Sequence, residues 1–247
     1  MSGVKAVPAP WELKGRTWLF ILPSLSKTAS FPAGFSAPHE ADVLTAGGEF
    51  VGGPGSIQVV SYTDSPVGPY DELVYTPGRW KYADGSFAFR ITRIYVSSKE
   101  STENGRRNWN IPKQVAVFDI GSGKDGVTTI TVSHPGSRIP FFKVSVKPIP
   151  VLSRLPIPLN TRLLGKYFTL MQPPLPAGNK TEEVETTRWA SMTPVLTGTS
   201  RLVSVTPLLD GKVGDGAGYP AVAPWTLGAC TDPLALDFRG AVFSDSV

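Results

Sequence analysis

Short runs in which apolar and polar residues alternate recur along most of the chain, separated by glycine and proline. The run at residues 141–147 is the clearest, with Phe142, Val144 and Val146 on one side and polar residues on the other. This two-residue period is typical of a strand with one buried face. Similar runs predict strands at residues 57–62, 72–75, 127–133, 162–171, 183–192 and 201–208. Their close spacing favours a mainly β barrel or sandwich over alternating strand–helix units.

The run at residues 87–97 is longer and carries apolar residues on both of its faces. This pattern predicts one central strand that is buried on both sides. Arg90 and Arg93 lie three residues apart in it, so they face opposite sides of the sheet. One of them is a candidate to enter a cavity and bind a substrate carboxylate. The alternative is an arginine whose charged end reaches solvent at the end of the strand.

Helical periodicity is weak throughout the chain, and we expect only short helices, near residues 38–45 and 99–108. Residues 1–17 are rich in proline and are predicted to form a surface arm, with Trp11 and Trp18 as its anchors. The whole chain, residues 1–247, is predicted to be a single domain. A hydrophobic content of 41% and a charged content of 18% are typical of a globular protein.

Charge and composition exclude several classes of function. The net charge is +4, and the only basic cluster is Arg106–Arg107, so we expect no nucleic-acid partner. Cys230 is the only cysteine, which rules out an internal disulfide and a cysteine zinc site. His39 and His134 are the only histidines, which leaves a histidine-rich metal site without ligands. We expect no metal and no cofactor, because phosphate-loop and dinucleotide fingerprints are also absent from the sequence.

The apolar run at residues 18–22 is too short for a secretory signal or a membrane span. The sequence therefore predicts a cytoplasmic protein without a membrane partner.

Lys113 is the first candidate for catalytic chemistry. It follows Pro112, which fixes its own backbone angle φ, and it precedes the apolar run at residues 115–118. If its face of the strand looks into a barrel, desolvation disfavours the ammonium and makes the neutral amine available as a nucleophile. Such an amine can condense with a carbonyl to form a Schiff base, which acts as an electron sink. The alternative is a lysine that ends a strand in water.

Glu72 is the second candidate. Asp71 and Glu72 follow a Pro-Val-Gly-Pro turn and lead into a strand, so only one of the two can point inward. A carboxylate beside the iminium could orient the substrate or move protons. The alternative is an acidic residue of a solvated loop.

Two motifs together resemble the acetoacetate decarboxylase-like superfamily. They are SPVGPYDE at residues 65–72 and GRRNWNIPK at residues 105–113. The longer phrase at residues 91–113 is most similar to the fungal branch, which indicates a role in specialised metabolism. The resemblance extends from about residue 52 to residue 118. It implies a mainly β fold, an antiparallel closed barrel or cone with few short helices and a buried pocket, often within a homo-oligomer.

The resemblance places Lys113 at the Schiff-base lysine and Glu72 at a pocket glutamate. Two positions depart from the decarboxylases. Gln114 stands where they carry a second lysine, and the strand around Gln58 lacks a further pocket acid. Both departures cast doubt on acetoacetate as the substrate and leave the Schiff-base chemistry in place.

The predicted function is a lysine Schiff-base enzyme, decarboxylase-like, that acts on a β-keto acid or a related carbonyl metabolite. Lys113 and Glu72 are its predicted catalytic residues, and Arg93, Arg106 and Gln114 are its predicted substrate contacts. Arg106 could equally be structural. One alternative is a non-catalytic β-barrel that binds an apolar metabolite. Another is an aldolase, dehydratase or cyclase that uses the same iminium without loss of CO₂.

Overall fold

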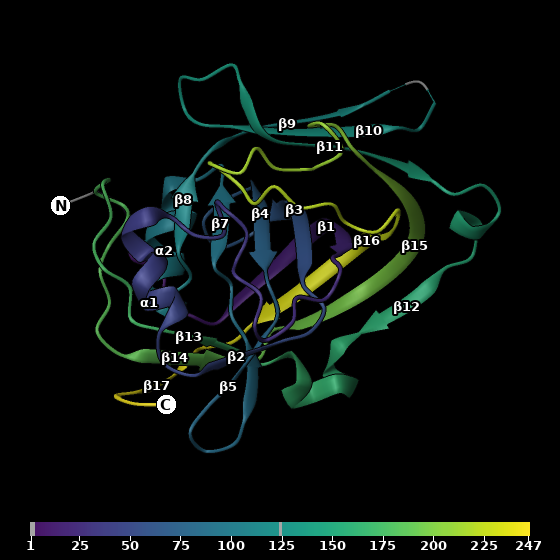
Figure 1. The fold of residues 1–247 in the computed structure, drawn as a ribbon. Coiled ribbons are helices and arrows are strands. Elements are labelled where there is room, and N and C mark those ends of the chain that lie inside the picture. The colour runs from purple at the N-terminus through teal and green to yellow at the C-terminus, as the bar shows by residue number, and fades with distance from the viewer. Residues whose placement is uncertain (1–2, 124) are drawn as a thin grey trace.

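The computed structural model describes residues 3–123 and 125–247, and its fold consists of two β-sheets with few helices (Figure 1). The larger sheet has the strand order β8-β7-β4-β3-β1-β16-β15-β11-β10-β9, with β12 paired to β15. Its strands are β1 (Trp11–Ile21), β3 (Ser56–Asp64), β4 (Tyr70–Thr76), β7 (Arg93–Val96), β8 (Lys113–Val115), β9 (Val117–Ser122), β10 (Thr128–Ser133), β11 (Pro140–Pro148), β12 (Ile157–Asn160), β15 (Val195–Pro207) and β16 (Leu227–Phe238).

The smaller sheet has the order β17-β14-β13-β6-β5-β2. Its strands are β2 (Glu49–Gly52), β5 (Arg79–Lys81), β6 (Phe87–Phe89), β13 (Leu170–Gln172), β14 (Trp189–Met192) and β17 (Val242–Ser244). The helices are α1 (Ala41–Thr45), α2 (Lys99–Trp109) and the 3₁₀ segments Pro38–Glu40, Leu152–Arg154 and Thr161–Phe168. The mainly β prediction, with short helices near residues 38–45 and 99–108, is confirmed.

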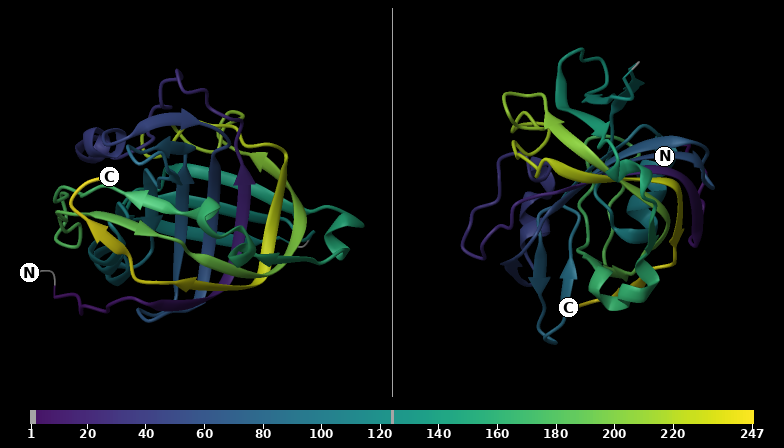
Figure 2. Two further views of the ribbon diagram at one scale, coloured as in Figure 1. Left: turned by 90° about the horizontal axis from the view of Figure 1, so that it is seen from below. Right: turned by 90° about the vertical axis from the view of Figure 1, so that its right-hand side faces the viewer.

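The larger sheet curls round on itself without a strand pair that closes it (Figure 2). Strands β8 and β9 are the two ends of its order, and only Ala116 separates them in the chain. No pairing joins these two edges in the part of the chain that the structure describes. Each sheet also contains one parallel pair, β7 with β8 and β6 with β13. The expectation of a purely antiparallel, closed barrel is corrected accordingly.

Strands β3 and β4 are buried on both faces, which explains why their sequences are apolar at consecutive positions. Val59 and Leu73 belong to one hydrophobic cluster, whereas Val60 and Val74 belong to the other. The second cluster also holds Trp11 and the residues around α2. Because successive side chains of a strand alternate, the face that each residue of β4 or β8 occupies follows from its parity.

Three sequence-based expectations are wrong in detail. Residues 11–17 are part of β1, which lies between β3 and β16 in the large sheet, so of the described part of the predicted arm only residues 3–10 lie outside a strand. The run at residues 87–97 contains β6 and β7, which belong to different sheets. Residues 161–168 form a 3₁₀ segment, and β13 begins only at Leu170. Long-range pairing, which local periodicity does not report, decides the first two of these cases.

Helix α2 makes the connection that the parallel pair β7–β8 requires. Its first turn is capped by Ser98, whose hydroxyl accepts a hydrogen bond from the Ser101 amide. It ends at Asn110, which adopts a left-handed backbone with φ 53°. Strand β8 starts three residues later at Lys113. The helix thereby fixes both the position and the direction of the lysine strand.

No helix of the described residues combines the length and the apolar character that crossing a membrane requires.

Candidate active site

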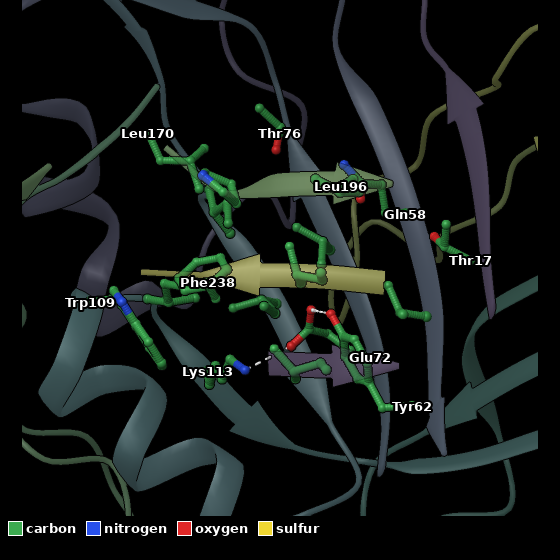
Figure 3. Close-up of a pocket in the computed structure, with 18 of the residues that line it drawn as sticks. Thr17, Gln58, Tyr62, Glu72, Thr76, Trp109, Lys113, Leu170, Leu196 and Phe238 are labelled. Carbon is green, nitrogen blue, oxygen red and sulfur yellow. Dashed lines mark hydrogen bonds and ion pairs between the residues drawn. The ribbon is translucent and has the colours of Figure 1, made fainter. Parts of the chain in front are cut away.

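Lys113 is the first residue of β8, and its side chain is buried, with 4% of the residue exposed. Its ammonium nitrogen Nζ donates to Oε2 of Glu72 at 2.7 Å (Figure 3). The same nitrogen donates to the Ser101 hydroxyl at 3.0 Å. The Tyr70 ring lies 5.2 Å from the same nitrogen, with the cation over its face. These groups hold the nitrogen in one place at the wall of a cavity.

Glu72 lies on β4 and points to the same side as Lys113. The sequence argument that only one of Asp71 and Glu72 faces inward therefore resolves in favour of Glu72. Its second oxygen, Oε1, accepts a hydrogen bond from the Tyr62 hydroxyl at 3.4 Å. Burial, and to a lesser extent the charge of Glu72, raise the pKa of Tyr62 well above its usual value. Tyr62 is thus a neutral phenol that donates to the carboxylate.

Helix α2 presents Ser101 and Gly105, one turn apart, to the lysine side chain. A methyl group on Gly105 would lie 2.6 Å from Cδ and 2.8 Å from Cε of Lys113, too close for ordinary contact. Gly105 therefore leaves the space that the lysine occupies. Sequence analysis missed Ser101, Gly105, Tyr62 and Tyr70. The spacing of Ser101 and Gly105 by four helical residues was the available signal for two of them.

The cavity beside Lys113 and Glu72 has a volume of about 160 Å³. Its wall is formed mainly by apolar side chains of β1, β3, β4, β7, β16 and the end of α2. Trp11, Leu13, Trp109 and Phe238 are among them. Gln58, on the strand where the decarboxylases are expected to carry a further acid, also lines this cavity.

The predicted anion contacts lie elsewhere. Arg93 has the opposite parity to the cavity-lining Ile94, and it donates to the Gly218 carbonyl and to the Tyr95 hydroxyl. Arg90 donates to the carbonyls of Leu44, Ala46 and Gly47. Neither arginine lines the cavity. Both guanidinium groups hold loops in place, so neither lies where it could bind a substrate carboxylate in this cavity.

Arg106 and Gln114 are outside the cavity as well. Arg106 is fully buried and donates to Glu40 at 2.5 Å and to the carbonyls of Val184 and Pro176. It is the structural arginine that the sequence left open as an alternative. Gln114 is half-buried and follows Lys113 in the strand, so its side chain faces the other way. Of the five predicted site residues, the fold brings only Lys113 and Glu72 together.

Among the described residues, no group of three or more histidine, cysteine, aspartate or glutamate side chains could hold a metal ion. Around the nitrogen of Lys113, the structure brings together an amine, a carboxylate, a hydroxyl and two phenols.

Solved structures resemble this chain over nearly its whole length. Acetoacetate decarboxylase from Legionella pneumophila superposes with a TM-score of 0.64 over 99% of this chain and 92% of that one, at 9% identity. The fold is that of the acetoacetate decarboxylases. An acetoacetate decarboxylase-like enzyme from Sphingomonas wittichii gives a TM-score of 0.61 at 10% identity, over 98% of this chain and 95% of that one. The enduracididine biosynthesis enzyme MppR gives 0.56 at 17% identity, over 98% and 90%.

Sequence comparison reaches less far. No family model matches the chain. The protein named Neoxanthin-deficient 1 is 35% identical in rice and 36% identical in Arabidopsis, each over 109 residues. The match covers 44% of this chain and 33% or 36% of those proteins, so it spans about a third of the relatives' length.

Proposed function

We propose that this protein is a Schiff-base enzyme of the lyase type, in which Lys113 is the nucleophile and Glu72 transfers protons. One observation carries the proposal: the buried Nζ of Lys113 lies 2.7 Å from a carboxylate at the wall of an apolar cavity. Burying an ammonium in an apolar environment costs free energy, even when the ammonium has a partner. Lysines are therefore rarely buried, and one that faces an apolar cavity indicates a function for its amine.

The pair divides the first steps between them. An ammonium is not a nucleophile, and Glu72 is positioned to accept its proton. The neutral amine then attacks the carbonyl carbon, a carbon–nitrogen bond forms, and the carbonyl electron pair moves to the oxygen. Protonation of that oxygen and loss of water give the iminium, with the carboxylate of Glu72 beside its positive charge. Ser101 holds the nitrogen in position through its hydroxyl.

The iminium can accept the electron pair of a neighbouring bond. If that bond joins a carboxylate, CO₂ leaves, and the resulting enamine is protonated at carbon before hydrolysis releases the product. If the bond is carbon–carbon or carbon–hydrogen, the same intermediate supports aldol or elimination chemistry. The fold accommodates such variety, since MppR has been solved with pyruvate and with the condensation product of pyruvate and imidazole 4-carboxaldehyde.

A second candidate, a barrel that binds an apolar metabolite without reaction, is favoured by the composition of the cavity. Most of its lining is apolar. The name of the partial relatives also refers to neoxanthin.

The two candidates are separated by Lys113→Met, whose side chain keeps the length and apolar body of lysine and loses the amine. A series of β-keto acids and ketones is followed for CO₂ release and for exchange of α-protons with deuterated water, and binding is followed through tryptophan fluorescence. In the enzyme, the variant loses both reactions while binding persists. Wild-type protein that binds the compounds and catalyses neither reaction would identify a binding barrel.

The fungal affiliation, a place in specialised metabolism, homo-oligomerisation and a cytoplasmic location stay predictions from the sequence.

A further inference from the structure

The charges around the cavity are few and balanced. Of the described residues that line it, only Lys113 and Glu72 are charged, and they are paired with each other. No arginine and no second lysine reaches it, because Arg90, Arg93 and Arg106 are engaged with the protein itself. The cavity therefore has no cation to spare for a substrate anion.

The neutral net charge of the Lys113–Glu72 pair decides which carbonyl compounds the cavity can bind. A neutral ketone or aldehyde leaves this net charge unchanged, because the iminium nitrogen keeps the positive charge that the ammonium had. A β-keto acid adds an unpaired carboxylate to an apolar space, close to the like charge of Glu72. Burying such a charge without a partner is costly, and placing it beside another carboxylate costs more.

The opposite part of the cavity is polar but uncharged. Ser56 and Gln58 on β3 and Thr76 on β4 line it, and Ser56 pairs directly with Thr76 across the two strands. Within the part of the chain that the structure describes, none of these three side chains forms a hydrogen bond. Their donors and acceptors are available to a ligand, and Gln58 can both donate and accept.

Strand pairing gives the distance between the two polar ends. Lys113 pairs with Ile94, Ile94 with Val74, and Val74 with Gln58, so these residues form one row across four strands. Three strand spacings of about 4.8 Å separate the ends of the row by about 14 Å along the sheet. Figure 3 shows Lys113 and Gln58 at opposite sides of the group, with apolar side chains between them.

The entrance is apolar as well. Phe168 lines the cavity and is 38% exposed, so it lies where the cavity meets solvent. The same 3₁₀ segment exposes Leu163, Leu164 and Tyr167, at 85%, 48% and 70%. An entrance of this kind favours an apolar compound over a small charged acid.

We propose that the substrate is an uncharged, extended apolar ketone or aldehyde with a distal hydroxyl or carbonyl group. Its reactive carbonyl meets Lys113, and the distal group is bound by Gln58 with Ser56 or Thr76. This inference rests on the proposed Schiff-base function and specifies its substrate class.

The reaction that follows for such a substrate releases no CO₂. The carboxylate of Glu72 takes a proton from the carbon next to the iminium carbon. The electron pair of that carbon–hydrogen bond forms a carbon–carbon double bond, and the π electrons of the iminium move to nitrogen to give a neutral enamine. No oxidant or other reactant is required. The enamine is the starting point for aldol, elimination or cyclisation chemistry.

The test uses four methyl ketones or keto acids of similar length: 10-hydroxydecan-2-one, 2-undecanone, 9-oxodecanoate and 3-oxodecanoate. Each is titrated against the protein with borohydride present, and the reduced adduct on Lys113 is quantified by peptide mass spectrometry. The hydroxyketone should half-saturate Lys113 at a concentration about 2- to 10-fold below that of 2-undecanone, the value of one hydrogen bond. For 3-oxodecanoate the concentration should be about 100-fold higher or more.

Two variants of one residue sharpen the result. Gln58→Leu should remove the advantage of the hydroxyketone and leave 2-undecanone unaffected. Gln58→Arg should improve 9-oxodecanoate at least tenfold, because it supplies the missing cation at the distal end. Thermal melting checks that both variants fold.

Saturation of Lys113 by 3-oxodecanoate at or below the hydroxyketone's concentration would overturn the inference and leave the Schiff-base function standing. An unchanged ranking in Gln58→Leu would overturn the role of the distal group. Absence of an adduct from all four compounds would contradict the proposed function itself.

Discussion

Two buried cations from one stretch of sequence, Arg106 and Lys113, have different surroundings. Arg106 donates to Glu40 and to two backbone carbonyls, and its side chain is 0% exposed and does not line the cavity beside Lys113. Lys113 donates to Glu72 and Ser101, and its nitrogen borders the cavity. Both cations form short ion pairs, at 2.5 Å between Arg106 and Glu40 and 2.7 Å between Lys113 and Glu72. The first connects α2 to loops, whereas the second is accessible to a small molecule.

The comparison teaches that burial and pairing alone do not identify a catalytic group. A guanidinium with all its partners inside the protein contributes to structure, and its charge is permanent. An amine that can give its proton to a neighbouring carboxylate, with empty space on its other side, can react. Substitutions of Lys113 and Arg106 should separate the reactive cation from the structural one.

The largest effect is expected from Lys113→Met. Removal of a covalent nucleophile should lower turnover by about 10³-fold or more. Glu72, left without its cation, borders the cavity, so it can be hydrated or protonated and the fold should persist. Glu72→Gln is the matched control on the partner and should lower turnover by about 10²- to 10⁴-fold. Steady-state kinetics together with thermal melting measure both quantities, and an active Lys113→Met protein would contradict its assignment as the nucleophile.

Arg106→Met should lower the stability of the fold and leave the reactivity of Lys113 intact. It leaves Glu40 buried without a partner, which costs about 3–5 kcal/mol of folding free energy. Urea denaturation measures the loss. The fraction that remains folded should still form the Lys113 adduct, because Arg106 does not line the cavity. Full stability combined with lost reactivity would assign Arg106 to the active site instead.

Gly105→Ala reduces the space around the side chain of Lys113 without removing or adding a charge. Alanine is better than glycine in a helix by about 1 kcal/mol, so the helix itself is not weakened. The added methyl displaces Cδ and Cε of Lys113, and a shift of about 1 Å can lower turnover by about 10²-fold. Gly121→Ala is the control, because a methyl there meets no atom within 4 Å. Equal kinetics for the two variants would show that Gly105 has no positioning role.

The smallest effect concerns His39, beside the structural pair. The carboxylate of Glu40, whose Oε1 lies 3.6 Å from Nε2 of His39, raises the pKa of His39 above its usual 6.5. A raised folded-state pKa stabilises the protein below the unfolded pKa, and this contribution is lost as the pH rises through the folded value. Compared with His39→Gln, the wild type should therefore lose melting temperature as the pH rises above 6.5 and through the raised pKa of His39. If the melting temperatures of the two proteins changed with pH in the same way, His39 would not contribute to the pH dependence of stability. The Lys113 adduct should form equally in both proteins.

Local sequence was sufficient for part of the fold and part of the site. Alternation identified β11, and capping residues agree with the start and end of α2. Proline followed by lysine before an apolar run made Lys113 a candidate, and the fold places it at the wall of a cavity. The strand β1 was missed because prolines precede it and because its pairing partners lie far along the chain. The partners of the arginines could not be predicted, because only the tertiary fold shows that they are Gly218, Glu40 and loop carbonyls.

The central claim is that Lys113 is a reactive amine, and borohydride trapping tests it most directly. The folded protein is incubated in turn with each of the four carbonyl compounds named above, reduced, digested and mapped by mass spectrometry. The account predicts a carbonyl-dependent adduct on the peptide that contains Lys113, in excess over every other lysine. Labelling spread over surface lysines, or no label on folded protein, would contradict it.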